Sequence, residues 1–343
     1  MPSSRVTLAD VAHNAGVSRT TASFVMSGRT DMRISADAQH RVLDAAAELG
    51  YRPNLTARGL RTSVTRTIGL ISDTIATTQY AGEVIHGALD TALKHDRLLF
   101  IGETSGDPKL EARLIEEMLD RQVDGVIYAV TYTRQAHPPP SLLGLPVVLL
   151  NVIDDSFNGP TILPDELNGG RTAARALLEA GHSQGIYSIG GRHKTADAPD
   201  GVYAGRERMD GIEEVLGTAG VRLAGVAECA WEPEYGYAAV HDMLESGHRP
   251  RALICLNDRV ALGAYQALQE KGLRIPEDVS VVSFDDSELA RWLRPQLSSV
   301  ALPHYELGEA AVTRLVENKL EHEVLLAPMP IRSRSSVAQV TQR

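Results

Sequence analysis

The chain has 343 residues, of which 43% are hydrophobic and 23% are charged, as in ordinary soluble proteins of two or three domains. No apolar run reaches the roughly 18 residues of a membrane span. The first residues, MPSSRVTLAD, lack the apolar stretch of a secretory signal. We therefore expect a cytoplasmic protein with no membrane partner.

The formal net charge of −10 is unevenly distributed along the chain. Residues 1–66 contain nine Arg, no Lys and five acidic residues, whereas the remainder carries 25 basic and 39 acidic side chains. The chain therefore has a small basic head on an acidic body. DNA is the simplest partner for such a head.

The head pattern predicts three short helices: Leu8–His13, Arg19 to about Met26, and a third that Ser35 caps and Gly50 ends. Thr7 and Ser18 can cap the first two helices with side-chain oxygens, and Gly16 supplies the turn between them. This spacing fits a helix-turn-helix, although a surface helical hairpin gives the same pattern.

The start of the second helix carries side chains suited to DNA. Hydroxyl groups and a guanidinium there can reach base edges and phosphates. The helix N-terminus itself also favours phosphate. The candidate DNA contacts in the head are Thr7, Ser18, Arg19, Thr20, Thr21 and Ser23.

A hinge is predicted after the head. Tyr51-Arg52-Pro53-Asn54 breaks the helical pattern, and Leu55–Arg61 is long enough for one or two helical turns. Gly59 weakens such a helix by about 1 kcal/mol relative to Ala. So short a segment is marginal as a free helix.

From Thr67 onward, apolar strands alternate with amphipathic helices. The predicted strands are Ile68–Ser72, Leu98–Glu103, Gly125–Val130, Val147–Asn151, Ile186–Gly190, Ala252–Asn257 and Val279–Phe284. The predicted helices are Glu83–His95, Lys109–Arg121, Gly169–Ala180, Arg206–Ala219 and Asp258–Lys271. This alternation predicts an α/β fold of two doubly wound parallel-sheet subdomains, split near Asn158–Asp165. The polar tail Ile331–Arg343 predicts partial disorder.

The sequence does not support a catalytic or a metal-binding site. Gly181–Gly185 satisfies the G-x-S-x-G pattern of a hydrolase, but a helix precedes it and a strand follows, the reverse of what that motif needs. Neither a Walker A nor a G-x-G-x-x-G sequence occurs. Cys229 and Cys255 lack ligand spacing. We therefore expect no enzyme, no cofactor and no metal.

Polar residues gather at the carboxyl ends of the predicted strands, where open α/β sheets bind ligands. These residues are Asp73, Asn151, Asn257 and Asp285. Trp231 follows the strand-like run Gly225–Ala230, and Arg208 lies near the start of a helix. Two subdomains with facing strand ends would surround a cleft with these groups.

One family resemblance covers essentially the whole chain. The stretch TLADVAHNAGVSRTTASFVMSGR, continued by ISADAQHRVLDAAAELGYRPNLTARGLRT, resembles the head of the lactose/galactose repressor (LacI/GalR) family. RERMDG, LNDRVALGA and SVVSFDD extend the similarity. The sequence departs from the family at Phe24 and Ala22, where many members carry Arg and Val. Operator preference therefore cannot be copied from relatives.

The resemblance implies three parts: a helix-turn-helix domain over 1–53, a hinge over 54–66, and an effector-binding and dimerisation domain over 67–343. The last resembles periplasmic sugar-binding proteins, with an N-subdomain of about 67–160 and 294–325 and a C-subdomain of about 161–293 and 326–343. By resemblance, the hinge enters the minor groove through Asn54, Ala57, Arg58 and Leu60. Leu60 would be a wedge that unstacks a base step, unless it merely packs against the larger domain.

By the same resemblance, Arg208, Trp231, Asn257 and Asp285 line the effector pocket, with Asp73, Asn151 and Asp165 as further candidates. Arg208 can donate a fork of hydrogen bonds to hydroxyls or a carboxylate. Trp231 can cover the apolar face of a sugar. The local alternatives are that Arg208 pairs with Glu207 or Asp210 and that Trp231 is core filler.

The sequence thus predicts a homodimeric, effector-controlled repressor that binds a pseudo-palindromic operator. The small polar effector is a sugar, or alternatively a purine. The stretch Thr77–Tyr80 lacks the family's usual Asn-Pro-Phe, so we expect the near wall of the pocket to differ from that of relatives. The rival interpretation is a solute-binding protein or an α/β enzyme with an incidental helical head.

Overall fold

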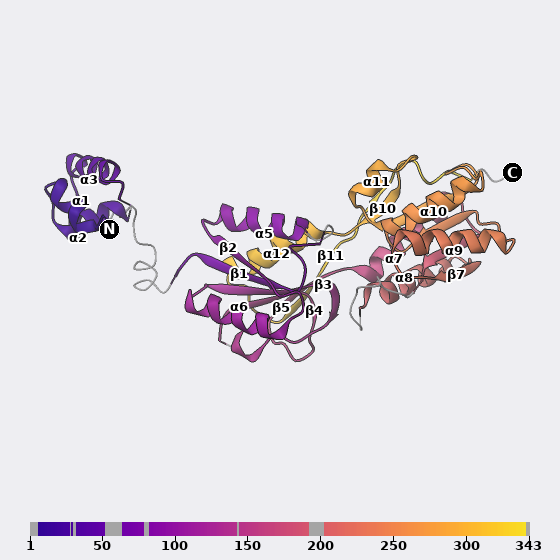
Figure 1. The fold of residues 1–343 in the computed structure, drawn as a ribbon, viewed down its shortest axis with the longest axis horizontal. Coiled ribbons are helices and arrows are strands. Elements are labelled where there is room, and N and C mark those ends of the chain that lie inside the picture. Colours follow the sequence, from indigo (N-terminus) through magenta and orange to yellow (C-terminus); the bar gives the residue numbers. More distant parts are fainter. Residues whose placement is uncertain are drawn as a thin grey trace. The chain divides into compact units, whose positions relative to one another are not determined.

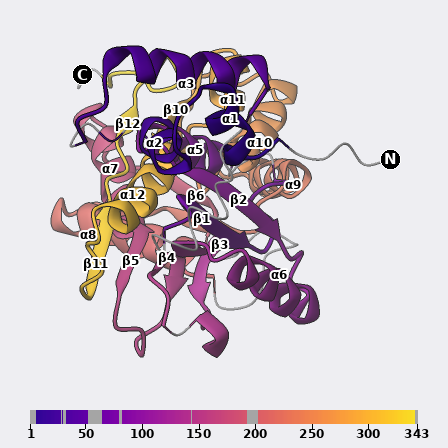
Figure 2. The same ribbon diagram turned by 90° about the vertical axis from the view of Figure 1, so that its left-hand side faces the viewer.

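The computed structural model describes residues 6–27, 29, 32–51, 64–78, 82–142, 144–191 and 202–340 (Figures 1 and 2). The chain forms two compact units, Met1–Thr65 and Arg66–Arg343. Of the predicted hinge, only residues 64–66 are described. No helix in the described part of the chain is long and apolar enough to cross a membrane.

The first unit contains the three helices that the sequence predicts: α1 (Leu8–Asn14), α2 (Arg19–Met26) and α3 (Ala36–Glu48). Thr7 and Asp10 cap α1 reciprocally, each side chain bonding the other residue's backbone N–H. Gly16 makes the turn with a φ of 63°. The core is built of small residues: Val11, Ala12, Ala15, Ala22, Val42, Ala45 and Ala46.

The second unit begins with an N-lobe around a six-stranded parallel sheet of order β11-β5-β4-β3-β1-β2. Its strands are β1 (Thr67–Ser72), β2 (Leu98–Glu103), β3 (Gly125–Gln135), β4 (Val147–Ile153), β5 (Pro160–Pro164) and β11 (Glu323–Ala327). Helices α5 (Gly82–Lys94) and α12 (His304–Val316) cover one face, and α6 (Pro108–Asp120) covers the other (Figure 1).

The C-lobe has a second six-stranded sheet, of order β12-β10-β9-β8-β6-β7, in which only β12 is antiparallel. Its strands are β6 (Ile186–Gly190), β7 (Gly225–Glu228), β8 (Ala252–Cys255), β9 (Ser280–Asp285), β10 (Ser298–Ala301) and β12 (Ile331–Arg332). Its helices are α7 (Glu166–Glu179), α8 (Ala204–Thr218), α9 (Pro233–Glu245), α10 (Asp258–Glu270) and the short α11 (Glu288–Trp292). The predicted fold of two parallel-sheet subdomains is confirmed.

The chain crosses between the lobes three times: after β5, between β10 and α12, and between β11 and β12. The sequence placed the first two crossings near 161 and 294. The first crossing lies at 165, within the predicted split of Asn158–Asp165, because β5 pairs with β4 in the N-lobe. The second lies instead at 302–303, because β10 pairs with β9 in the C-lobe. Both strands are too short to stand out in the sequence.

The described part of the polar tail, residues 331–340, is hydrogen-bonded to the C-lobe, whereas the sequence predicts partial disorder there. The hydroxyl of Ser336 is buried and donates to the carbonyl of Val281. The backbone N–H of Val340 donates to the carbonyl of Ala180. Polar composition misled the prediction, because these polar groups bond to the C-lobe and not to water.

Two glycines bring α7 and α8 into close contact. A Cβ on Gly170 would lie 2.1 Å from the backbone oxygen of Arg208, and one on Gly211 would lie 2.1 Å from that of Leu167. Only glycine permits such an approach. The contact sets the start of α7 beside Arg208 in α8.

Candidate functional site

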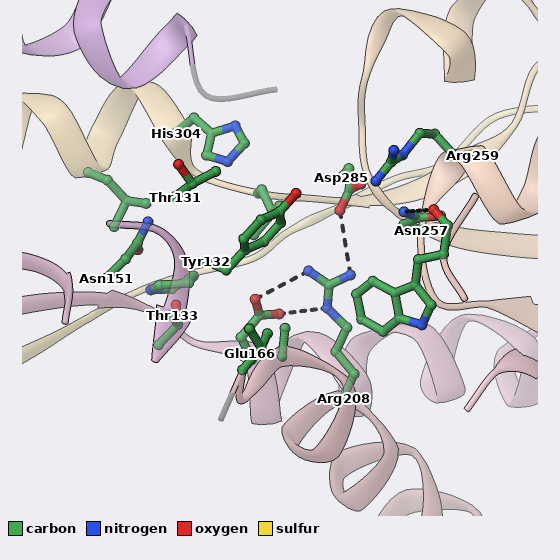
Figure 3. A pocket seen from close by; sticks show the side chains of 16 residues that line it. Thr131, Tyr132, Thr133, Asn151, Glu166, Arg208, Asn257, Arg259, Asp285 and His304 are labelled. Carbon is green, nitrogen blue, oxygen red and sulfur yellow. Dashed lines mark hydrogen bonds and ion pairs between the residues drawn. The ribbon is translucent and has the colours of Figure 1, made fainter. Parts of the chain in front are cut away.

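A pocket lies between the two lobes and is lined from both sides (Figure 3). The N-lobe contributes Thr131, Tyr132 and Thr133 from β3 and Asn151 from β4. Polar lining residues of the C-lobe are Glu166, Arg208, Trp231, Asn257, Arg259 and Asp285. This is the carboxyl-end position at which open α/β sheets bind ligands.

Arg208 is the centre of the pocket's polar network and is only 2% exposed. Its Nε and Nη2 donate to the two carboxylate oxygens of Glu166, at 2.7 and 3.2 Å. Its Nη1 donates to the carbonyl of Leu256 at 2.5 Å and, more weakly, to Asp285 at 3.5 Å. Figure 3 shows the guanidinium held between the two carboxylates. The carboxylate-binding fork is therefore already occupied by the protein's own Glu166.

Two acceptor residues of the pocket have strained backbones. Asn151, near the carboxyl end of β4, has a φ of 59°, and Asp285 ends β9 with a φ of 101°. Positive φ is uncommon outside glycine and is often kept where a side chain must point at a ligand. Burial raises the pKa of Asp285, against the lowering effect of the Arg208 charge.

Asn151 offers an acceptor that the protein does not use. The side chain is 5% exposed, and its Nδ2 donates to the carbonyl of Val130 at 3.0 Å. Its Oδ1 is buried and has no hydrogen-bond partner. Leaving such a group unbonded costs about 1–3 kcal/mol, so a donor on a ligand would satisfy it.

Trp231 and Asn257 form a connected wall. The Oδ1 of Asn257 caps α10 by accepting from the backbone N–H of Val260 at 2.8 Å, and its Nδ2 donates to the carbonyl of Trp231 at 3.2 Å. The Trp231 indole donates to the carbonyl of Gly190 at 3.3 Å. Both residues line the pocket, and both also stabilise the C-lobe.

Two of the sequence-predicted effector residues do not line this pocket. The Asp73 carboxylate accepts from Thr131 and from Arg134, at 2.7 and 2.8 Å, and borders a separate groove of the N-lobe. Asp165 caps α7 by accepting from the backbone N–H of Asn168 at 3.1 Å. Its neighbour Glu166 faces the pocket instead.

The sequence reasoning missed several lining residues: Thr131, Tyr132, Thr133, Glu166, Arg259 and His304. Glu166 gave no signal because β5, which precedes it, was not predicted. Arg259 lies within the quoted LNDRVALGA motif and pairs with Glu232 at 2.5 Å. Burial and the nearby Arg208 charge lower the pKa of His304 to about 4, so its imidazole is neutral at pH 7.

The head presents the start of α2 to solvent. Arg19 and Thr20 are exposed, whereas Thr21 and Ser23 are half-buried. Ser18 accepts from the backbone N–H of Thr21 at 3.0 Å, so it serves as the helix cap. The hinge contacts proposed from the sequence, namely Asn54, Ala57, Arg58 and Leu60, lie outside the described residues.

Taken together, a helix-turn-helix head and a two-lobed body with a polar pocket between its lobes define a transcription regulator with a ligand-binding domain. Among the described residues, no three His, Cys, Asp or Glu side chains gather as metal ligands.

Comparisons with known proteins give the family. Residues 7–54 match the bacterial regulatory proteins of the lacI family, and residues 174–337 match a periplasmic binding protein-like domain. The chain is 34% identical to the ribose operon repressor of Haemophilus influenzae, over 91% of each chain. It is 33% identical to the transcriptional repressor PurR of the same species, over 91% of this chain and 90% of that one.

A crystal structure of the Lac repressor dimer bound to operator and the anti-inducer ONPF is also similar. Its TM-score is 0.77 at 26% identity, over 97% of this chain and 99% of that one. The chain belongs to the lacI family of bacterial regulatory proteins, and it is a DNA-binding transcription regulator.

Proposed function

We propose that this chain is a homodimeric repressor that binds a pseudo-palindromic operator through its head and a small polar effector through the pocket between its lobes. The observation that carries the proposal is the pairing of a capped helix-turn-helix with a buried polar pocket lined from both lobes. We further propose that it acts in the cytoplasm and has no enzymatic activity.

Effector binding between the lobes would favour one arrangement of the lobes over the other. The arrangement of the lobes would then determine whether the hinge folds, and folding of the hinge would determine the affinity for the operator. Because this coupling is an equilibrium property, operator and effector must change each other's affinity by the same factor. The proposed contacts are Arg208, Asp285, Asn257 and Trp231 from the C-lobe and Asn151 from the N-lobe.

A neutral sugar is the effector class that the pocket supports best. Hydroxyl groups can donate to the unbonded Oδ1 of Asn151 and to the carboxylates of Glu166 and Asp285. The Trp231 indole, which lines the pocket, supplies an apolar wall. The similarity to a ribose operon repressor agrees with this class. A purine, the alternative that the sequence leaves open, is the second candidate.

Exposed apolar side chains support the homodimer. Edge strand β2 exposes Leu98, Phe100 and Ile101, and in the C-lobe Trp292 is 66% exposed and Tyr235 45%. An apolar sheet edge is prone to pair with another chain, and large exposed aromatic residues mark interfaces. A second copy that covers both regions would join the two heads in one DNA-binding unit, as an operator with two half-sites requires.

A two-stage screen tests the proposal. Sugars and nucleobases are first screened by thermal unfolding, since a ligand at 100 times its Kd stabilises by about 2.7 kcal/mol. Each compound that binds is then added to a DNA-binding titration with the full chain. The proposal predicts a sugar that changes specific operator affinity. Binding of a compound with no effect on operator affinity would contradict control by this pocket.

A further inference from the structure

The charge state of the pocket follows from its ion pairs. Arg208 and Arg259 are the guanidinium groups that line it, and each is paired with a carboxylate: Arg208 with Glu166 at 2.7 Å and Arg259 with Glu232 at 2.5 Å. The one imidazole among the described lining residues, His304, is neutral at pH 7 because its pKa is lowered to about 4.

The hydrogen-bond capacity of the pocket leads to the same conclusion. Four of the five N–H groups of Arg208 are used, two by Glu166, one by Leu256 and one by Asp285. Among the groups left to meet a ligand are three sets of acceptors: the unbonded Oδ1 of Asn151 and the further lone pairs of the Glu166 and Asp285 carboxylates. An acidic ligand would bring its charge close to these two carboxylates, with no free fork to receive it.

We propose that Glu166 determines the charge specificity of the effector pocket. By occupying the Arg208 fork, it restricts the pocket to uncharged ligands whose hydroxyl groups donate, and it excludes carboxylated and phosphorylated analogues. The inference rests on the proposed function, since it names the ligand class of the same pocket. It assigns to Glu166 a role in specificity that lies beyond holding Arg208 in place.

The chain contains a matched control for this pair. Arg171 of α7 and Glu214 of α8 join the same two helices by a 2.8 Å ion pair on the exposed surface, outside the pocket. Glu214→Gln therefore removes the same charge from the same helix pair without changing the pocket. The double variant Glu166→Gln with Arg208→Gln removes the charges of both partners of the ion pair. It should therefore lose any affinity for anions that Glu166→Gln gains.

The test uses the full chain and anions that need no knowledge of the natural effector. Inorganic phosphate and the pair D-ribose and ribose 5-phosphate are titrated by calorimetry and by thermal unfolding at constant ionic strength. In Glu166→Gln the freed guanidinium should bind phosphate and ribose 5-phosphate at least tenfold more tightly than the wild type does. Glu214→Gln and the double variant should behave like the wild type.

Glu166→Ala covers the case in which Glu166→Gln folds poorly. Acetate should enter the vacated space, pair with Arg208 and raise the unfolding temperature of this variant in a saturable way, with no such effect on the wild type or on Glu214→Ala. The proposal is overturned if the wild type binds the anions as tightly as Glu166→Gln does, or if neither Glu166 variant gains affinity for an anion. A failure to find any sugar that alters operator binding would contradict the proposed function and not this inference. The anion titrations use neither the natural effector nor the operator.

Discussion

Arg208→Ala should destabilise the effector domain strongly, in addition to removing a ligand contact. The substitution leaves Glu166 without its cation, and the Glu166 side chain is only 7% exposed. Removing one partner of a buried ion pair costs about 3–5 kcal/mol, since the remaining charge has neither water nor a counter-ion. At about 2–4 °C per kcal/mol for a domain of this size class, the unfolding temperature should fall by about 6–20 °C.

The assay is thermal unfolding of the full chain by calorimetry, in which the transition of the larger unit is followed. Arg171→Ala is the control because its surface pair with Glu214 is worth about 0–1 kcal/mol. Replacing both Arg208 and Glu166 by apolar residues should recover much of the loss, since no unpaired charge remains between them. An Arg208→Ala protein that unfolds within 1 kcal/mol of Arg171→Ala would refute the reasoning.

Four further outcomes are expected. Deleting residues 1–65 should abolish DNA binding in an anisotropy titration while the thermal transition of the larger unit persists, and specific binding by the truncated chain would contradict this. Leu60→Ala should weaken operator binding far more than binding to random DNA, because a wedge acts only on kinked DNA; equal losses would exclude the wedge. Asp285→Asn should keep operator affinity but shift the effector dose-response about tenfold to hundredfold, and an unchanged dose-response would remove Asp285 from the pocket. Because the folded-state pKa of His304 is lowered from 6.5 to about 4, its contribution to stability is present above pH 6.5 and is lost as the pH falls toward 4. Stability-versus-pH curves of His304→Gln should therefore be flatter in that window, and a parallel curve would show that His304 does not contribute.

The sequence predicts the α/β architecture well because long elements leave strong patterns. Helix α10 was expected over Asp258–Lys271 and spans Asp258–Glu270, and the apolar run of β1 matches its prediction closely. Short strands escape this reasoning. The four residues of β10 carry no distinctive period, and only their pairing with β9 assigns them to the C-lobe.

The pocket was predictable only in part, for a geometric reason. Ligands of open α/β sheets bind at the carboxyl ends of the strands, which identifies one edge of the sheet. The position along that edge depends on the order of the strands, which the sequence does not reveal. Asp285 ends β9, Asn151 lies near the carboxyl end of β4, and both line the pocket. Asp73 instead follows β1 and bonds with Thr131 and Arg134 of the neighbouring β3. Glu166 depends on the α7–α8 contact, which only the three-dimensional packing reveals.

The central claim, that the head of this chain binds a specific operator as part of a dimer, is tested most directly by selecting DNA from a random pool with the full-length protein. The account predicts enrichment of a pseudo-palindrome whose two half-sites bind one dimer, with no enrichment by the chain that lacks residues 1–65. Recovery of no common sequence by the full chain, or of the same sequence by the truncated chain, would contradict it.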